Sequence, residues 1–190
     1  MRLQKSASGL LVLALLTPCA IHAQQASAAK DGVPSTEQNV AGPQQAAQPK
    51  DTLLLTAGAN HAPVSLSLTD FRSIPHVTIT VHNAHADADE TYSGVPLVVL
   101  LAKLDAPLGE HLRGKALASY IVALGSDGYS VVLSIAEADP NFHGGEILVA
   151  DTRDGQPLGK SGPFQLIVSE DKRPARWVHN LVSISLQNIQ

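Results

Sequence analysis

The sequence has little of several residue types on which common kinds of site depend. Its 190 residues include one cysteine, one methionine, one tryptophan and six other aromatic residues. A single cysteine excludes an internal disulfide framework, an iron–sulfur cluster and a cysteine-rich zinc site. Basic residues number 13 against 17 acidic ones, so the formal net charge is −4 and no nucleic-acid partner is expected.

Three common sequence motifs are also missing or incomplete. There is no Gly-x-Gly-x-x-Gly and no Gly-x-Ser-x-Gly elbow. Gly-Gln-Pro-Leu-Gly-Lys-Ser at residues 155–161 is one residue short of a phosphate-binding loop. It also precedes a predicted strand, whereas a phosphate-binding loop must open a helix. We therefore interpret this segment as a turn.

Residues 1–23 have the pattern of a secretory signal. Arg2 and Lys5 supply positive charge, residues 10–16 are apolar, and Ala23 offers a small residue for cleavage. The apolar run is too short to span a bilayer, so no transmembrane segment is expected after cleavage. The alternative is an N-terminal anchor that is never cut. The signal predicts a periplasmic or secreted protein.

Cleavage after Ala23 would change the chemistry open to the chain. The mature protein would have 167 residues and no cysteine, because Cys19 lies in the removed segment. It could then offer no thiolate to a metal. Residues 24–50 are rich in Ala, Gln and Pro and have few apolar side chains, so we predict a disordered tether.

Residues 51–190 have the composition and patterning of one globular domain. Alternating or continuous apolar runs predict strands at 53–55, 64–68, 76–82, 118–124, 129–134, 146–150, 164–168 and 178–186. Short helical segments are expected near 69–71, capped by Thr69 or Asp70, near 97–104 and near 135–139, and a polar loop at 83–91. Asp127 and Gly128 are expected to form a tight turn, in which Asp127 accepts backbone N–H bonds and Gly128 has a positive φ. Glu137 and Asp139 are expected in capping and surface roles. The predicted class is α+β, with strand-dominated mixed sheets and two or three short helices.

Imidazole and carboxylate groups gather in the predicted polar loop. His82, His85, Asp87 and Asp89 have ligand types that suit zinc or copper. Most of them lie on a loop of small residues, so a solvated loop is the alternative that we favour, and no metal site is predicted. We interpret His143, which precedes two glycines, as a surface residue in the same way.

Four segments in a fixed order carry a resemblance to a known family. They are Tyr-Ser-Gly-Val-Pro-Leu at 92–97, Gly-Ser-Asp-Gly-Tyr at 125–129 with Ser-Ile-Ala-Glu-Ala-Asp-Pro at 134–140, Leu-Val-Ala-Asp at 148–151 with Asp-Gly-Gln-Pro-Leu at 154–158, and Gly-Pro-Phe-Gln-Leu-Ile-Val at 162–168 with Arg-Trp-Val at 176–178. The ordered set, over residues 66–186, resembles the molybdopterin-binding domain of the sulfite oxidase family.

The resemblance implies a mixed α+β fold and a molybdopterin cofactor in an oxidoreductase. In the family a cysteine thiolate completes the metal's ligands, at the end of the strand before Gly-Val-Pro-Leu. This chain has residues 80–84 there, without cysteine, and His82 is the nearest residue with metal-ligand chemistry. Gln165 stands where a basic residue often follows the Gly-Pro pair. The fold is therefore expected to carry over, whereas the family's chemistry is not, and the cofactor stays open.

Basic residues near the end of the chain are the other candidates for ligand contact. Lys172, Arg173 and Arg176 lie close together in sequence, and an arginine fork suits phosphate or carboxylate. A solvated turn paired with Glu170 and Asp171 is the alternative. Together with His82, these three residues are the predicted cofactor-binding set, and no catalytic residue is predicted. Trp177 is expected in the core.

Two functions follow as hypotheses. The first is a non-catalytic module that binds a small anionic or pterin-like ligand, or an envelope protein partner. The second is a molybdenum-cofactor oxidoreductase with an unusual ligand set that includes His82. The missing thiolate favours the first hypothesis.

Overall fold

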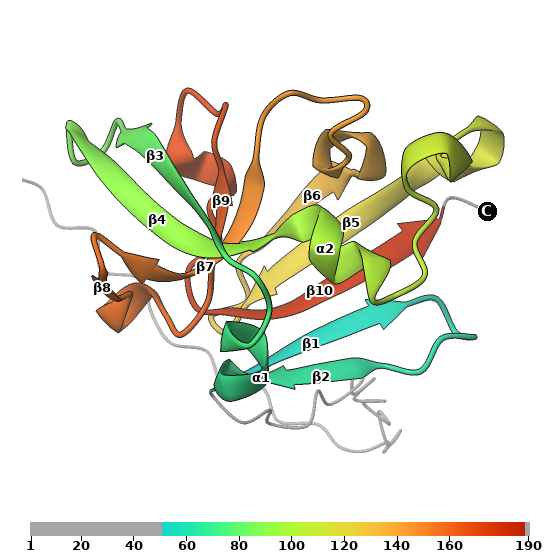
Figure 1. Ribbon diagram of the computed structural model, residues 1–190, viewed down its shortest axis with the longest axis horizontal. Coiled ribbons are helices and arrows are strands. Elements are labelled where there is room, and N and C mark those ends of the chain that lie inside the picture. Colours follow the sequence, from blue (N-terminus) through green and yellow to red (C-terminus); the bar gives the residue numbers. More distant parts are fainter. Residues whose placement is uncertain (1–50, 189–190) are drawn as a thin grey trace, which may run out of the picture. The chain divides into compact units, whose positions relative to one another are not determined.

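Two five-stranded sheets dominate the computed structural model, which describes residues 51–188 (Figure 1). The predicted signal peptide and tether lie outside the described residues. No helix within residues 51–188 is long and apolar enough to cross a membrane.

The first sheet joins the two ends of the domain. Its strand order is β2 (Val64–Ser67), β1 (Thr52–Ala57), β10 (Leu181–Asn188), β5 (Ser119–Gly125) and β6 (Ser130–Ser134). β1 and β10 run parallel, with Leu55 opposite Ile184, and the other neighbours are antiparallel. Figure 1 shows the first strand, in cyan, beside the last, in red. Residues of β1 alternate between buried and half-buried, as expected for a strand with one core face.

The second sheet carries the most deeply buried strands. β3 (Val77–Asn83), β4 (Ala88–Pro96), β7 (Ile147–Arg153) and β8 (Gln156–Pro157) follow one another, and β9 (Gln165–Val168) also pairs with β7. The register of β4 on β7 shifts between Ser93 and Gly94. A Cβ at Gly94 would overlap the carbonyl oxygen of Val149, so the close approach of the two strands requires glycine.

Short helices connect these strands. α1 (Leu68–Arg72) begins at Ser67, whose side chain forms a capping box with Asp70, and α2 (Leu97–Ala102) begins directly after Pro96. The remaining turns are 3₁₀ helices: η1 (Gly109–His111), η2 (Gly114–Ala118), η3 (Ile135–Ala138), η4 (Gly159–Ser161) and η5 (Pro174–Arg176).

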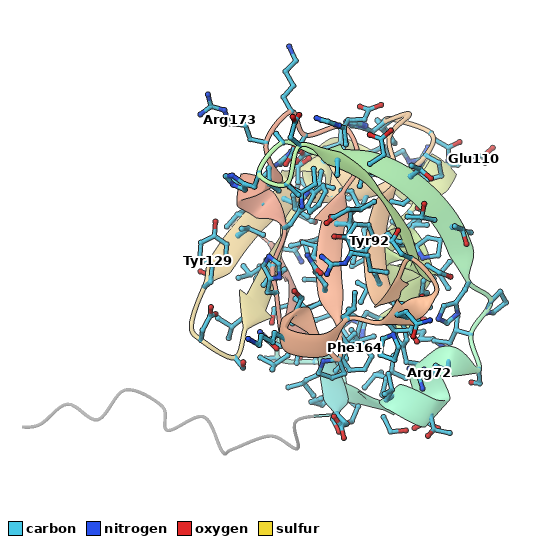
Figure 2. The ribbon with its side chains drawn as sticks, turned by 90° about the vertical axis from the view of Figure 1, so that its left-hand side faces the viewer. Arg72, Tyr92, Glu110, Tyr129, Phe164 and Arg173 are labelled. Atoms are coloured by element: carbon cyan, nitrogen blue, oxygen red, sulfur yellow. The ribbon has the colours of Figure 1, made fainter. Side chains whose placement is uncertain are left out.

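Side chains from both sheets form one buried cluster. Phe71 and Phe164 meet edge to face with 4.9 Å between ring centroids, and Tyr92 meets Trp177 in the same way at 5.7 Å. Figure 2 shows Tyr92 and Phe164 in the middle of the domain, with Arg173 and Glu110 at its edges. The α+β, strand-dominated class is confirmed, and so is the core position of Trp177.

Two local expectations were wrong. The predicted polar loop at 83–91 already contains the start of β4, because Glu90 is buried by tertiary partners that a sequence pattern cannot reveal. The first helix is capped by Ser67 rather than by Thr69 or Asp70. Val77 is exposed, although it shares a face with the buried Val81, because β3 is an edge strand.

Candidate functional site

A cleft of about 510 Å³ opens where the second sheet meets the turns that follow β3, β5 and β9. Asn83 and His85 come from the end of β3, Arg153 from the end of β7, and Pro174 and Ala175 from η5. Small-molecule sites in proteins are typically concave and of this size. The cleft is therefore the candidate ligand site of the described domain.

Two buried aromatic rings form one wall of the cleft. Tyr92 projects from β4, and Trp177 follows η5. The indole Nε1 of Trp177 donates a hydrogen bond of 3.1 Å to the carbonyl oxygen of Val168, which fixes the ring plane. A rigid aromatic wall of this kind suits the face or edge of a flat ligand.

Glu90 links the polar groups on the same side of the cleft. Its carboxylate accepts hydrogen bonds from the Tyr92 hydroxyl at 2.6 Å, from Asn83 Nδ2 at 2.9 Å and from Arg153 Nη1 at 3.3 Å. Burial, and then the hydrogen bond with Glu90, raise the pKa of Tyr92 well above its ordinary value. Tyr92 is therefore a neutral hydrogen-bond donor, and the charge of Arg153 is compensated by Glu90.

Gln165 lies at the first position of β9, where its backbone pairs with Ala150. The residue is wholly buried and lines the cleft. Neither its Nε2 nor its Oε1 has a hydrogen-bond partner among the described residues. An unpaired buried amide costs about 1–3 kcal/mol, so this side chain stands out in an otherwise well-paired core.

A tight turn forms part of the rim of the cleft. Asp127 Oδ1 accepts a hydrogen bond of 2.9 Å from the Tyr129 backbone, and Gly128 adopts a φ of +86°, which confirms the expected roles of both residues. The Tyr129 hydroxyl donates to the carbonyl oxygen of Ala175 on η5. Tyr129 is about half exposed and connects the two loops that flank the cleft.

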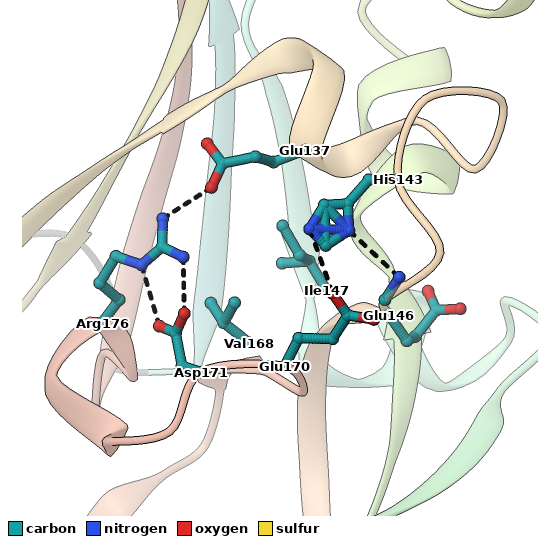
Figure 3. Close-up of a pocket in the computed structure, with 9 residues that line it drawn as sticks. Glu137, His143, Glu146, Ile147, Val168, Glu170, Asp171 and Arg176 are labelled. Carbon is teal, nitrogen blue, oxygen red and sulfur yellow. Dashed lines mark hydrogen bonds and ion pairs between the residues drawn. The ribbon is translucent and has the colours of Figure 1, made fainter.

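Arg176 lies in a neighbouring small pocket, where its guanidinium is hydrogen-bonded to acidic side chains (Figure 3). Nε and Nη2 donate to the two carboxylate oxygens of Asp171 at 2.9 and 2.6 Å, and Nη1 donates to Glu137 at 2.8 Å. These bonds, offset in part by burial, raise the pKa of Arg176 further above its ordinary value. The fork expected to hold an anion is thus engaged within the protein.

Glu137 and Asp139, expected in capping and surface roles, differ in their surroundings. Glu137 forms a capping box with Ser134 at the start of η3, which confirms capping. Asp139 is buried, and Oδ1 accepts a hydrogen bond of 2.9 Å from the Asn141 backbone, so the surface role is wrong for this residue.

His143 is half-buried rather than free on the surface, which corrects the sequence-based interpretation. Its Nδ1 accepts a hydrogen bond from the Gly145 backbone at 3.2 Å, and its Nε2 lies 3.3 Å from Glu170 (Figure 3). Glu170 lies directly over Gly145, where a Cβ would overlap the glutamate side chain. Sequence position alone gave no signal for this contact.

The other three predicted cofactor-binding residues lie outside the lining of the cleft. His82 is exposed on β3, with its Nδ1 3.0 Å from Asp89 and its Nε2 3.8 Å from Asp87. Lys172 and Arg173 are exposed on the loop between β9 and η5. A cofactor role for these residues and Arg176 stays a prediction, and the cleft itself is built from other side chains.

The molybdenum cofactor implied by the resemblance fits this site only in part. Residues 51–188 contain no cysteine, and within that range no three His, Asp or Glu side chains are grouped to hold a metal ion. The described residues thus do not fit the metal. The aromatic wall and the unpaired amide of Gln165 do fit a flat organic ring with polar edges.

Comparisons with known proteins give a likeness in structure but none in sequence. No protein family model matches the chain, and no curated protein is similar in sequence. Among solved structures, the sulfane dehydrogenase SoxCD from Paracoccus pantotrophus superposes with a TM-score of 0.56 at 16% identity. The match covers 75% of this chain and 40% of the SoxCD chain, so this protein spans less than half of its neighbour's length. The described domain therefore shares its fold with part of a sulfur-compound oxidoreductase.

Proposed function

We propose that this protein is a secreted, non-catalytic module with a sulfite oxidase-like fold, and that its cleft binds a small, planar, pterin-like ligand. The observation that carries the proposal is the cleft, because it combines a ligand-sized volume with buried aromatic rings and a few polar groups. The fold shared with SoxCD and the ordered motifs support the sulfite oxidase-like assignment.

A binding role is favoured over oxidoreductase chemistry because of the residues present. The family's metal needs a soft thiolate ligand, and the only cysteine of the chain lies in the predicted signal peptide. His82, the alternative ligand, pairs with Asp89 on an exposed strand. A pterin-like ligand is favoured over a free anion, because Arg153, the one arginine or lysine that lines the cleft, already has a carboxylate partner.

Trp177 provides a direct test, since it is the only tryptophan of the chain and lines the cleft. We expect pterin to change the fluorescence of Trp177 in the mature protein and to raise its melting temperature. Ala175→Phe, which fills the rim of the cleft, should weaken binding by about tenfold or more. The matched control Ala102→Phe, at an exposed position of α2, should bind as the wild type does.

Unchanged fluorescence and melting temperature with both pterin and inorganic phosphate would contradict the proposal. That result would favour the alternative from the sequence analysis, binding of an envelope protein partner. Equal weakening by both phenylalanine variants would show that the effect does not depend on the cleft.

A further inference from the structure

Gln165 is the one buried polar side chain among the residues lining the cleft that the description above leaves without a use. Its side chain is fully buried at the start of β9, whose other three residues are apolar. Neither its amide nitrogen nor its amide oxygen has a partner among the described residues. Buried amides in native proteins are nearly always paired, so an unpaired one that lines a cleft indicates a missing partner.

The charges around the cleft indicate what kind of partner this is. Arg153 is the only lining residue with a permanent positive charge, and Glu90 compensates it at 3.3 Å. Asp127 adds a negative charge at the rim, and Tyr92 is a neutral donor bound to Glu90. His85 and His179 also line the cleft. With both imidazoles neutral, an anion would meet no uncompensated positive charge there, whereas a neutral molecule would lose little hydration free energy on entering.

The amide group itself defines the complementary chemistry. A primary amide presents two N–H donors beside one carbonyl acceptor, so its natural partner carries an acceptor and a donor on adjacent atoms. Lactams, imides and ureas have such an edge. We propose that the cleft recognises a neutral, planar ligand through a cis-amide edge, with Gln165 Nε2 donating to its carbonyl and Gln165 Oε1 accepting from its N–H.

This inference rests on the proposed function and deepens it. It assigns recognition to Gln165 instead of the basic residues, and it defines the ligand class by hydrogen-bonding pattern and charge. It also predicts an unusual property of the ligand-free protein. If the partner of Gln165 is the ligand, replacing the amide by an apolar group of similar shape should not destabilise the ligand-free fold.

The test compares Gln165→Met with the matched control Gln156→Met, at an exposed position of β8, in the mature protein. The probes are pterin and uracil, which carry a cis-amide edge, 1,3-dimethyluracil, which has lost the N–H donors, and inorganic phosphate. The side-chain amide signal of Gln165 in a ¹H–¹⁵N spectrum is identified by its disappearance in Gln165→Met. Affinities and melting temperatures are measured in parallel.

We expect pterin or uracil to shift the Gln165 amide signal, and 1,3-dimethyluracil and phosphate to leave it unchanged. Gln165→Met should weaken binding by about 10- to 100-fold and leave the ligand-free melting temperature unchanged or higher. Gln156→Met should behave as the wild type.

Other results separate the failure of this inference from the failure of the proposed function. Equal binding of pterin by wild type and Gln165→Met would overturn the inference and leave the binding module standing. Binding of phosphate but not of pterin or uracil would overturn the inference, because the cleft would then recognise an anion and not a neutral ligand. A lower melting temperature of Gln165→Met with unchanged binding would make the amide structural. Absence of binding by all probes would overturn both.

Discussion

Arg176 has the chemistry of a ligand-binding residue, but its side chain stabilises the fold through contacts within the protein. Its guanidinium joins the loop after β9, through Asp171, to the capping carboxylate of η3, through Glu137. About a third of the Arg176 side chain is exposed, so solvent screens part of the interaction. Two loops that are far apart in sequence are thereby held at the entrance of the small pocket.

We expect Arg176→Met to lower the free energy of unfolding at neutral pH by about 1–2 kcal/mol, because it leaves two carboxylates without their partner. The control Arg173→Met, at an exposed position, should change it by less than about 0.5 kcal/mol. Urea unfolding of the mature proteins measures both. An unchanged stability together with lost ligand binding would instead assign Arg176 to the ligand.

The same variant carries a pH signature. Burial raises the pKa of Glu137, but the hydrogen bonds from Arg176 and Ser134 outweigh it, so the pKa lies below its ordinary value of 4.5. The stability contributed by Glu137 is then present above that ordinary value and is lost as the pH falls through the lower pKa of the folded state. Arg176→Met should therefore show a weaker loss of stability in this acid range than the wild type.

At the scale of elements, the pairing of β4 with β7 depends on one missing side chain. The backbones approach so closely at Gly94 that any Cβ would overlap Val149, and the register shifts at the same point. Because the obstacle is backbone in a buried sheet, it cannot move aside as a flexible side chain would.

Gly94→Ala should therefore destabilise the domain by about 3 kcal/mol or more, or prevent folding. Gly144→Ala is the matched control, because a Cβ there meets nothing within 4 Å. Circular dichroism and thermal unfolding of the two variants measure the difference. Equal melting temperatures would show that the two strands can separate without cost, contrary to the structure.

Elements with strong periodicity could be predicted from the sequence, and those held by tertiary contacts could not. The alternating pattern at 118–124 becomes β5 almost residue for residue, because one of its faces lies on the core. The start of β4 was missed because Glu90 is polar in sequence and buried in the fold. Its burial depends on Arg153, which is 63 residues away and carries no local signal.

The candidate site was less predictable for the same reason. Sequence reasoning selected Lys172, Arg173, Arg176 and His82 by their chemical type, but it could not show that carboxylates already engage Arg176 and His82. The cleft is formed by residues from separate segments between 83 and 179, and its most informative member, Gln165, is recognised by the absence of partners among the described residues. Whether a buried side chain lacks hydrogen-bond partners can be determined only once the fold is known.

For the whole molecule, the proposal predicts a protein without bound metal. Purified from the periplasm of a host that makes molybdenum cofactor, the mature chain should contain no molybdenum above an empty-vector preparation. The physical reason is that the secreted chain offers no thiolate. Elemental analysis and fluorescence of oxidised pterin measure metal and pterin content separately.

A full equivalent of molybdenum would reverse this conclusion and favour the oxidoreductase alternative, with His82→Ala as the next variant. Pterin without metal would support the proposed ligand class. Absence of the protein from the periplasm would contradict the secretion on which the experiment depends.

The parallel pairing of β1 with β10 has a consequence for the order of events during synthesis. β1 pairs on its inner side with β10, so the first sheet stays incomplete until residues 181–188 have been synthesised. A nascent chain without β10 can complete the second sheet, whose last strand is β9, but it cannot complete the first sheet over the core. For a protein that is exported as proposed, we expect this arrangement to delay folding until β10 has been made, so that the chain is still unfolded as it begins to cross the membrane.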